Sequence, residues 1–458
     1  MRKTTKLAIL LAVLAALCLT VFLLSRRQAR QEAVRESGET ILAIDPESVT
    51  SLAWTNESGS FAFRREGDGW VYEGDEAFPV DGEKLTALLE PLEELGAAFT
   101  IEDARDLGQY GLSDPAGSVT VGTESGTYTL TLGDYSQLDA QRYLSLGDGK
   151  VYLVTHDPME EFDAVLRDLI LDDSIPAVAQ AEEITFSGAA DYTAVYDEDG
   201  VSVCGSDVYF SDGRPLDTDR VTNYLDTLSG LTLTDYVTYN ATAEELLAYG
   251  LETPELSVTV RYAGEDGDES FTVHLGRDQA ELQAAEETED YEAVTAYLRV
   301  GDSRIVYEIP QEDYETLAAA SYDDLRHQKL FTASLSQVTE LTVTLEGETY
   351  TLTHALPESE DEDGKWYYQG EEFDGTDLEN AVNSLRATDF TDRTASGREE
   401  IRLTAKLDRE DIPSLSLTLT RYDGDHCLAA LDGETVAYVK RSQAVDLIEA
   451  IHAVVLTG

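Results

Sequence analysis

The sequence predicts an α+β fold built from tandem related units of mostly antiparallel sheet with capped helices, preceded by one N-terminal transmembrane helix. The first observation is a repeat, because the stretch Tyr110–Pro115 (Tyr-Gly-Leu-Ser-Asp-Pro) returns as Tyr249–Pro254 (Tyr-Gly-Leu-Glu-Thr-Pro). The second is that each copy runs into alternating apolar and polar residues, Ser118–Val121 and Ser257–Val260, as half-buried strands do. Since tight turns and not helical crossovers join these strands, we expect antiparallel pairing.

The first element is an uncharged run of 18 residues from Leu7 to Leu24. This run is long enough to span a bilayer as a helix, and it exceeds the ~7–15 apolar residues of a cleaved signal peptide. Cys18 raises the alternative of a lipoprotein, but Leu17 before it is too bulky for a lipidation site. We expect a single-pass signal anchor in the cell membrane, with the N-terminus inside and the body outside the cytoplasm.

The charge of the chain is very uneven. Residues 1–40 carry a net charge of +4 and the whole chain of 458 residues carries −59, so the remainder carries −63. Such a surface repels phosphate, which excludes nucleic acid as a partner. The hydrophobic share of 42% still supplies apolar cores, so we expect the acidic body to be folded.

Three helices with the same N-terminal signature divide the body. Each has an aspartate cap, an apolar residue before the cap and another four positions after it, and the caps are Asp81, Asp217 and Asp374. Hairpins with matching Gly-Asp turns follow the first two helices, at Tyr143–Tyr152 and Tyr297–Tyr307. The predicted parts are an anchor with its connector at 1–40 and α+β repeat units at 41–175, 180–330 and 335–458.

Each unit is expected to end in a helix, near Met159–Leu171, Gln311–Leu325 and Ser442–Val455. The third unit has Asp411–Pro413 (Asp-Ile-Pro) in place of the Tyr-Gly-Leu motif, and its hairpin is shorter, so we expect a degenerate copy. The second unit carries an acidic insertion, Asp278–Ala296, which we expect to be a mobile loop.

No recognisable catalytic motif is present. The chain has no Gly-x-Ser-x-Gly elbow, phosphate loop or dinucleotide fingerprint, and its six histidines are not spaced as paired metal ligands. His274 falls within an alternating strand, where a packed or surface imidazole is preferred over a general base. We therefore expect no enzymatic activity, no catalytic residue, no cofactor and no metal ligand.

The segment Ser359–Gly364 comes nearest to a calcium loop. It lacks aspartate at the first position and has Gly370 where a bidentate glutamate is needed. An acidic hairpin turn is the preferred interpretation, and weak binding of a divalent cation outside the cell is the alternative.

The body has two cysteines, Cys204 and Cys427. They could form one disulfide, but two cysteines in a body of this length are no disulfide framework. Packing of both as small apolar residues is preferred.

Tyr110 and Tyr249 occupy equal places in the repeat, each before a glycine that is expected to need a positive φ. Tyrosine suits half-buried positions and interfaces, since it has an apolar body and a polar tip. Each ring either fills the core of its own unit, which is preferred, or belongs to a contact surface for a partner.

Three segments at one place in the unit carry a resemblance to a known family. Asp68–Tyr72 and Asp363–Tyr368 bear tryptophan before tyrosine, and Asp197–Val203 takes that place in the second unit. Together with the anchor, the Asp-capped helices and the Tyr-Gly-Leu motif, they resemble the bacterial family of domain of unknown function 4340. The resemblance implies a membrane-anchored partner of an ABC-type export system similar to gliding-motility transporters, and it brings no catalytic residue.

The function that we expect is therefore binding or scaffolding outside the cytoplasm, as an accessory component of an ABC-type transport system. Its partner would be the transporter's permease or an associated extracytoplasmic subunit. Because the body is acidic, the complementary surface should be basic or bridged by cations, and salt should weaken binding. An extracytoplasmic solute-binding protein and a cell-wall-associated structural protein are the alternatives.

Overall fold

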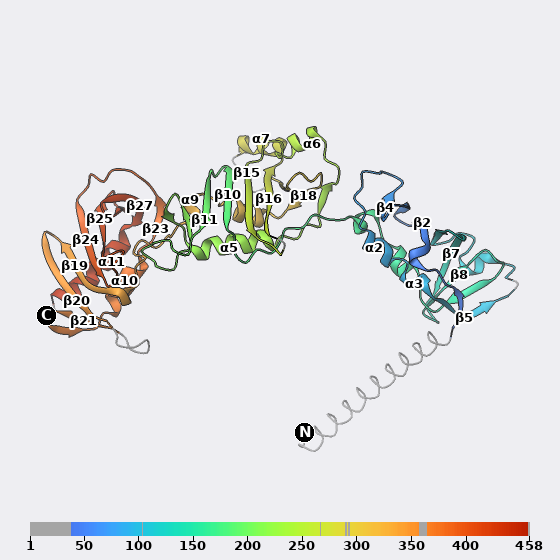
Figure 1. Ribbon diagram of the computed structural model, residues 1–458, viewed down its shortest axis with the longest axis horizontal. Helices are drawn as coiled ribbons and strands as arrows, with labels where there is room; N and C mark the ends of the chain where they lie inside the picture. The colour runs from blue at the N-terminus through green and yellow to red at the C-terminus, as the bar shows by residue number, and fades with distance from the viewer. Residues whose placement is uncertain are drawn as a thin grey trace, which may run out of the picture. The chain divides into compact units, whose positions relative to one another are not determined.

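The computed structural model describes residues 38–102, 104–265, 267–288, 291, 294–356 and 364–456 (Figure 1). They form three nine-stranded sheets, and every pairing between their named strands is antiparallel, which confirms repeated α+β units. The chain divides into two compact units, Met1–Asp173 with the first sheet and Ser174–Gly458 with the other two. The predicted membrane helix at Leu7–Leu24 lies outside the described residues, and among those described no helix is long and apolar enough to cross a membrane.

Each sheet takes its strands from one stretch of chain. The strands of the first sheet are β1 (Glu39–Leu42), β2 (Val49–Asn56), β3 (Gly59–Glu66), β4 (Gly69–Tyr72), β5 (Leu95–Ile101), β6 (Gly117–Thr123), β7 (Gly126–Ser136), β8 (Gln141–Ser145) and β9 (Val151–Val154). Those of the second are β10 (Glu183–Gly188), β11 (Tyr192–Tyr196), β12 (Tyr209–Ser211), β13 (Arg214–Pro215), β14 (Tyr236–Thr238), β15 (Leu256–Ala263), β16 (Asp268–Arg277), β17 (Ala296–Val300) and β18 (Val306–Ile309). Those of the third are β19 (Val338–Leu345), β20 (Glu348–Ala355), β21 (Lys365–Tyr368), β22 (Glu371–Phe373), β23 (Ala387–Phe390), β24 (Glu399–Leu407), β25 (Ser414–Arg421), β26 (His426–Leu431) and β27 (Glu434–Lys440).

The helices connect these strands. The α-helices are α2 (Gly82–Ala87), α3 (Glu90–Glu93), α4 (Met159–Phe162), α5 (Thr218–Ser229), α6 (Ala243–Ala248), α7 (Gln279–Thr288), α8 (Gln311–Ala318), α9 (Tyr322–Leu325), α10 (Thr376–Ser384) and α11 (Arg441–Val455). Short 3-10 helices are η1 (Pro46–Ser48), η2 (Leu107–Tyr110), η3 (Leu166–Leu169) and η4 (Leu335–Gln337).

The three sheets share one order of eight strands. It reads β5-β9-β8-β7-β6-β2-β3-β4 in the first, β14-β18-β17-β16-β15-β10-β11-β12 in the second and β23-β27-β26-β25-β24-β19-β20-β21 in the third. The first sheet adds β1 beside β5, whereas the others add a short strand, β13 or β22, at the opposite edge. The third unit, expected to be degenerate, therefore has the full set of strands.

Each sheet consists of two meanders joined at one central strand pair. The strand that opens the first meander, which is β2, β10 or β19, pairs there with the strand after the long loop, so that Leu52 faces Val121 in the first sheet. The helix between the meanders carries the chain from one edge of the sheet to the other, since β4 and β5, which flank α2 and α3, are opposite in the shared order.

The predicted aspartate caps begin the first two of these helices. Asp81 Oδ1 accepts hydrogen bonds from the backbone N–H of Glu83 (2.9 Å) and Lys84 (3.0 Å), and Asp217 caps α5 in the same way. In the third unit the helix begins one residue later than predicted, because Gly375 intervenes and Asp374 instead accepts from the N–H of Thr376. Satisfying these free N–H groups fixes where each helix starts.

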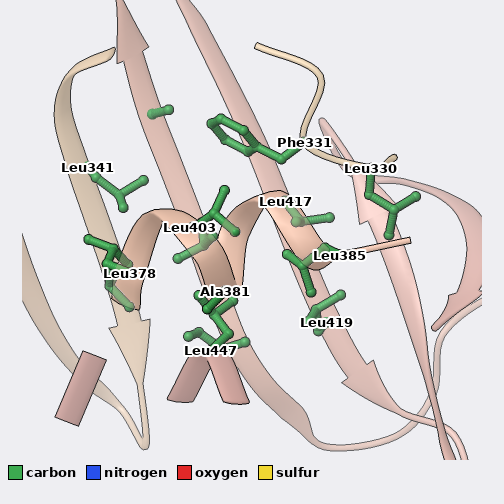
Figure 2. Packing of buried hydrophobic residues seen from close by; sticks show 14 of the residues in the cluster. Leu330, Phe331, Leu341, Leu378, Ala381, Leu385, Leu403, Leu417, Leu419 and Leu447 are labelled. Carbon is green, nitrogen blue, oxygen red and sulfur yellow. The ribbon is translucent and has the colours of Figure 1, made fainter. Parts of the chain in front are cut away.

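The third sheet shows how the helices bury their apolar face. Helices α10 and α11 pack together over the sheet, with buried residues at helical spacing on both. Figure 2 shows side chains from helices and strands meeting in this core, among them Leu378, Ala381 and Leu447 from the helices and Leu341, Leu403 and Leu417 from the strands.

The Tyr-Gly-Leu motif is the end of a short helix pressed against a strand. Gly111 and Gly250 both have φ +69°, as predicted. The N–H of Leu251 closes the turn by donating to the carbonyl of Leu246 at 2.7 Å. A Cβ on Gly276, the last glycine of the following strand pattern, would lie 2.6 Å from the carbonyl oxygens of Tyr249 and Gly250, so the repeat keeps glycine there for close backbone approach.

The predicted closing helices at Met159–Leu171 and Gln311–Leu325 are each broken in two. In the first unit, the side chains of Trp54 and Asn56 both donate to the carbonyl of Ala164 at 3.1 Å. This carbonyl therefore does not accept a backbone hydrogen bond of a continuous helix. In the second, Ser321 starts a new helix by accepting from the N–H of Asp324.

The acidic insertion Asp278–Ala296 is not the expected mobile loop, since its first part forms α7. Asp278 Oδ1 caps this helix by accepting from the N–H of Ala280 (3.0 Å) and Glu281 (2.9 Å). Alanine, glutamine and glutamate, which make up most of the helix, favour helical structure, and this local preference outweighs the acidity.

Two sequence alignments between units are wrong. Asp411–Pro413 lies between β24 and β25, where the other units have a simple hairpin turn, so it does not replace the Tyr-Gly-Leu motif. The second-unit counterpart of β4 and β21 is β12 and not Asp197–Val203. The turn before that strand has two residues in the first unit but twelve, 197–208, in the second, and this insertion displaced the alignment.

Gly276→Ala tests the close approach of the repeat motif. We expect the added Cβ to destabilise the fold by about 1–3 kcal/mol, as overpacking does. The control is Gly424→Ala, where a Cβ would meet nothing within 4 Å, and it should change stability by less than ~0.5 kcal/mol. Urea denaturation followed by circular dichroism measures both, and equal stabilities would show that the motif does not require glycine.

Candidate functional site

Tyr110 and Tyr249 lie at equal places on their own sheets. Each is half-buried, and its ring packs on a tyrosine of the same unit, Tyr110 on Tyr143 (centroids 5.1 Å apart) and Tyr249 on Tyr297 (4.6 Å). Tyr297 and its neighbour Leu298 point to opposite faces of β17, so the motif covers the face opposite the main core. Both rings thus contribute to packing within their units, and their use as a partner surface stays a prediction.

The strongest cluster of chemically versatile side chains lies between the second and third sheets, and we name Cys204, Asp207, Asp217 and His327 the junction cluster. Cys204 and Asp207 come from the twelve-residue loop between β11 and β12. Asp217 caps α5, and His327 follows α9 on the segment that leads to the third sheet.

The histidine of the junction cluster bridges two carboxylates. Nε2 of His327 lies 2.8 Å from Asp207 Oδ1, and its Nδ1 lies 3.2 Å from Asp217 Oδ2. The side chain of Asp207 is only 2% exposed. Its second oxygen, Oδ2, has no hydrogen-bond donor among the described residues, which is costly for a buried carboxylate.

The two carboxylates favour a charged imidazole. Burial alone would lower the pKa of His327, but hydrogen bonds to Asp207 and Asp217 outweigh it and raise the pKa to about 10. The hydrogen bond with His327 in turn lowers the pKa of Asp217. The protein therefore holds a positive charge between these carboxylates at neutral pH.

Contacts from the third sheet hold the loop that carries Cys204 and Asp207. Arg409 donates through Nη1 to the carbonyl oxygens of Ser202 (2.7 Å) and Val203 (3.1 Å), while Asp411 fixes its guanidinium. The side chain of Val203 packs against the core of the third sheet. The junction cluster is thus built jointly by two sheets of one compact unit.

Other residues considered in the sequence lie apart from this cluster. His274 is half-buried on β16, where its Nδ1 lies 2.8 Å from Ser257 Oγ and burial lowers its pKa, in agreement with a packed imidazole. Cys427 forms no disulfide with Cys204 of the cluster, and it is buried in the third core, where desolvation raises the pKa of its thiol to about 11. Most of Ser359–Gly364 lies outside the described residues.

A second candidate site is an acidic groove on the third sheet's helices, which we name the α10–α11 groove. Two adjoining cavities form it, one of about 310 Å³ at the start of α10 and one along the helix pair. Its floor is apolar, with Leu378 and Ala450. Among the described residues that line the two cavities none is basic and six carry carboxylates, namely Glu371, Glu372, Asp374, Asp377, Asp446 and Glu449.

The model of a protein family described as domain of unknown function (DUF4340) matches residues 70–185 and 211–406, about two thirds of the chain. The two matches begin at equivalent strands, in β4 and at the end of β12. The resemblance found in the sequence is thereby confirmed. No curated protein and no solved structure matches the chain.

His327→Gln should remove the positive charge of the junction cluster. In chelator-containing buffer at pH 7 we expect a loss of about 3–5 kcal/mol, as for breaking a buried ion pair, because Asp207 and Asp217 lose their common partner. The pKa of His327 is raised from 6.5 to about 10. The charged imidazole therefore stabilises the folded state fully below pH 6.5, and this stabilisation disappears as the pH rises through 10. The difference between the two proteins should therefore shrink between pH 7 and 10.

Urea denaturation across this pH range measures the effect. His452→Gln, which changes a half-buried histidine on α11, is the control and should follow the wild type. A difference between His327→Gln and the wild type that stays constant with pH would contradict the charged imidazole.

Proposed function

Because the chain belongs to the DUF4340 family, whose function is unknown, we propose a function from its own features: a membrane-anchored extracytoplasmic binding or scaffold protein, serving as an accessory component of an ABC-type transport system. The anchor would be the apolar run Leu7–Leu24, which confines the body near the bilayer and raises its effective concentration for membrane partners. Three copies of one sheet order then offer three related surfaces to such partners.

The observation that carries the binding role is the α10–α11 groove. Its apolar floor and acidic rim suit a basic amphipathic segment, which would bury its apolar side and pair its cations with the carboxylates. Lys365 pairs with Glu372 at 3.1 Å, but Glu371 and Asp377 are exposed. The proposed occupant is a basic extracytoplasmic segment of the permease or of its associated subunit.

The anchor is tested by adding charge to its centre. Leu14→Arg with Ala15→Arg should cost ~2.5–3.5 kcal/mol per residue and move the protein out of the membrane fraction, whereas Leu14→Ile with Ala15→Val should not. Protease added to wild-type cells with permeable walls should digest the body. Protection until lysis would reverse the orientation, and an unchanged membrane fraction for the arginine variant would refute the anchor.

The partner is tested by crosslinking after mild detergent extraction, with mass spectrometry of the products. We expect transporter subunits, with a yield that falls as salt rises. Glu371→Lys with Asp377→Lys should weaken capture roughly tenfold, the effect of about 1.4 kcal/mol.

The matched control makes the same charge change on exposed third-sheet residues outside the groove, Glu410→Lys with Glu434→Lys. Equal capture by both variants would refute the groove as the docking surface. Recovery of the protein alone, with a small molecule retained, would favour a solute-binding protein instead.

A further inference from the structure

We propose that the junction cluster is a zinc site, in which the Cys204 thiolate, an Asp207 carboxylate oxygen and Nε2 of His327 bind one Zn²⁺ and Asp217 orients the imidazole. This inference does not depend on the proposed transport role. It concerns residues to which neither the sequence patterns nor the family match gives a metal-binding role.

The proposed ligand atoms already lie close together without a metal ion. One ligand atom from each of Cys204, Asp207 and His327 lies within 4.8 Å of the other two. Tetrahedral zinc binds sulfur at ~2.3 Å and nitrogen or oxygen at ~2.0–2.2 Å, which places its ligand atoms ~3.3–3.6 Å apart. Side-chain adjustments of about 1 Å therefore close the site around an ion.

The loop geometry puts the thiol and the carboxylate on one side. Cys204 and Asp207 are three residues apart, and Gly205 between them has φ +78°, which turns the backbone sharply. Cys204 is partly exposed, whereas Asp207 is buried, so the thiol is the ligand of the pair that solvent reaches.

The histidine has the arrangement of a metal ligand with its supporting carboxylate. In such sites one ring nitrogen binds the metal and the other donates its proton to a carboxylate or carbonyl. Here Nδ1 of His327 lies 3.2 Å from Asp217 Oδ2, while Nε2 faces Asp207. Asp217 is itself fixed because it caps α5.

A metal-free ion pair leaves two features unexplained. The buried Oδ2 of Asp207 has no donor among the described residues. An ion pair between His327 and its carboxylates also gives no reason for the thiol of Cys204 to lie beside them. A dication would bind the carboxylate and the thiolate together. Lys329 and Arg409 interact electrostatically with Cys204, so two cations lie near the donor atoms and offset the negative charge that remains.

The ligand types select the metal. A thiolate and an imidazole with one carboxylate suit Zn²⁺, whereas Ca²⁺ and Mg²⁺ prefer six or more oxygen ligands. The three protein ligands leave the fourth position of a tetrahedral ion for water.

The experiment uses the full chain in mild detergent, stripped with a chelator and then titrated with Zn²⁺ or Co²⁺. We expect one Zn²⁺ per chain and, with Co²⁺, a thiolate-to-metal charge-transfer band in the near-ultraviolet. Cys204→Ser should abolish the band and lower affinity at least about 100-fold, while Asp217→Asn should lower it ~10–100-fold. Ca²⁺ should not compete.

The controls separate this site from the other thiols and from another cluster. Cys427→Ala removes the buried thiol, and His156→Gln alters the cluster of His156, Glu160 and Glu161, so both should bind Zn²⁺ as the wild type does. Cys204→Ser keeps the test valid if His327→Gln folds poorly, since Cys204 is partly exposed. No stoichiometric zinc, or a charge-transfer band that persists in Cys204→Ser, would overturn the proposal.

Discussion

The central strand pair of each sheet, β2 with β6, β10 with β15 and β19 with β24, is the constraint on which the rest of the fold depends. Ile184 faces Val260 across this pair in the second sheet, and Leu341 faces Ala405 in the third. Because the partners are distant in sequence, the helix between them must return across the sheet, and its apolar face then covers the strands it crosses. One pairing thus determines the strand order, the place of the helix and the position of the core.

Much of this fold could be predicted from local signals. Aspartate caps, strand alternation and the repeated Tyr-Gly-Leu motif are local, and they identified the helices and the antiparallel units. The predictions were wrong where the composition of a segment or the length of a turn suggested another structure. The acidity of Asp278–Ala296 hid a helix with a good cap, and the longer turn before β12 shifted the alignment of the second unit. Breaks in the closing helices depend on side chains of distant strands, such as Trp54, which no local pattern reveals.

The junction cluster could not be predicted from the sequence, because it too depends on residues that are distant along the chain. Cys204 and Asp207 are neighbours in sequence, but His327 is 120 residues from Asp207. The two residues meet only because α9 lies beside β13 and α5, where Tyr322 donates to the carbonyl of Pro215 and Arg220 to that of Asp324. A useful signal was present, since this turn is longest in the second unit, with twelve residues at 197–208. An expanded loop with a cysteine and an aspartate at close spacing merits attention as a possible ligand source even when no paired motif is found.

The segment between the second and third sheets is itself hydrogen-bonded as a strand. Gln328 O accepts from the N–H of Ala387 at 2.8 Å, and the N–H of Leu330 donates to Leu385 at 3.0 Å. Lys329 and Arg386 form an antiparallel bridge between them, next to β23. Mechanical tension along the chain would therefore meet these bonds where the chain enters the third core, to which Leu330 and Leu385 belong. Pulling the two sheets apart would therefore break hydrogen bonds at a sheet edge, together with those of Arg409 to Ser202 and Val203.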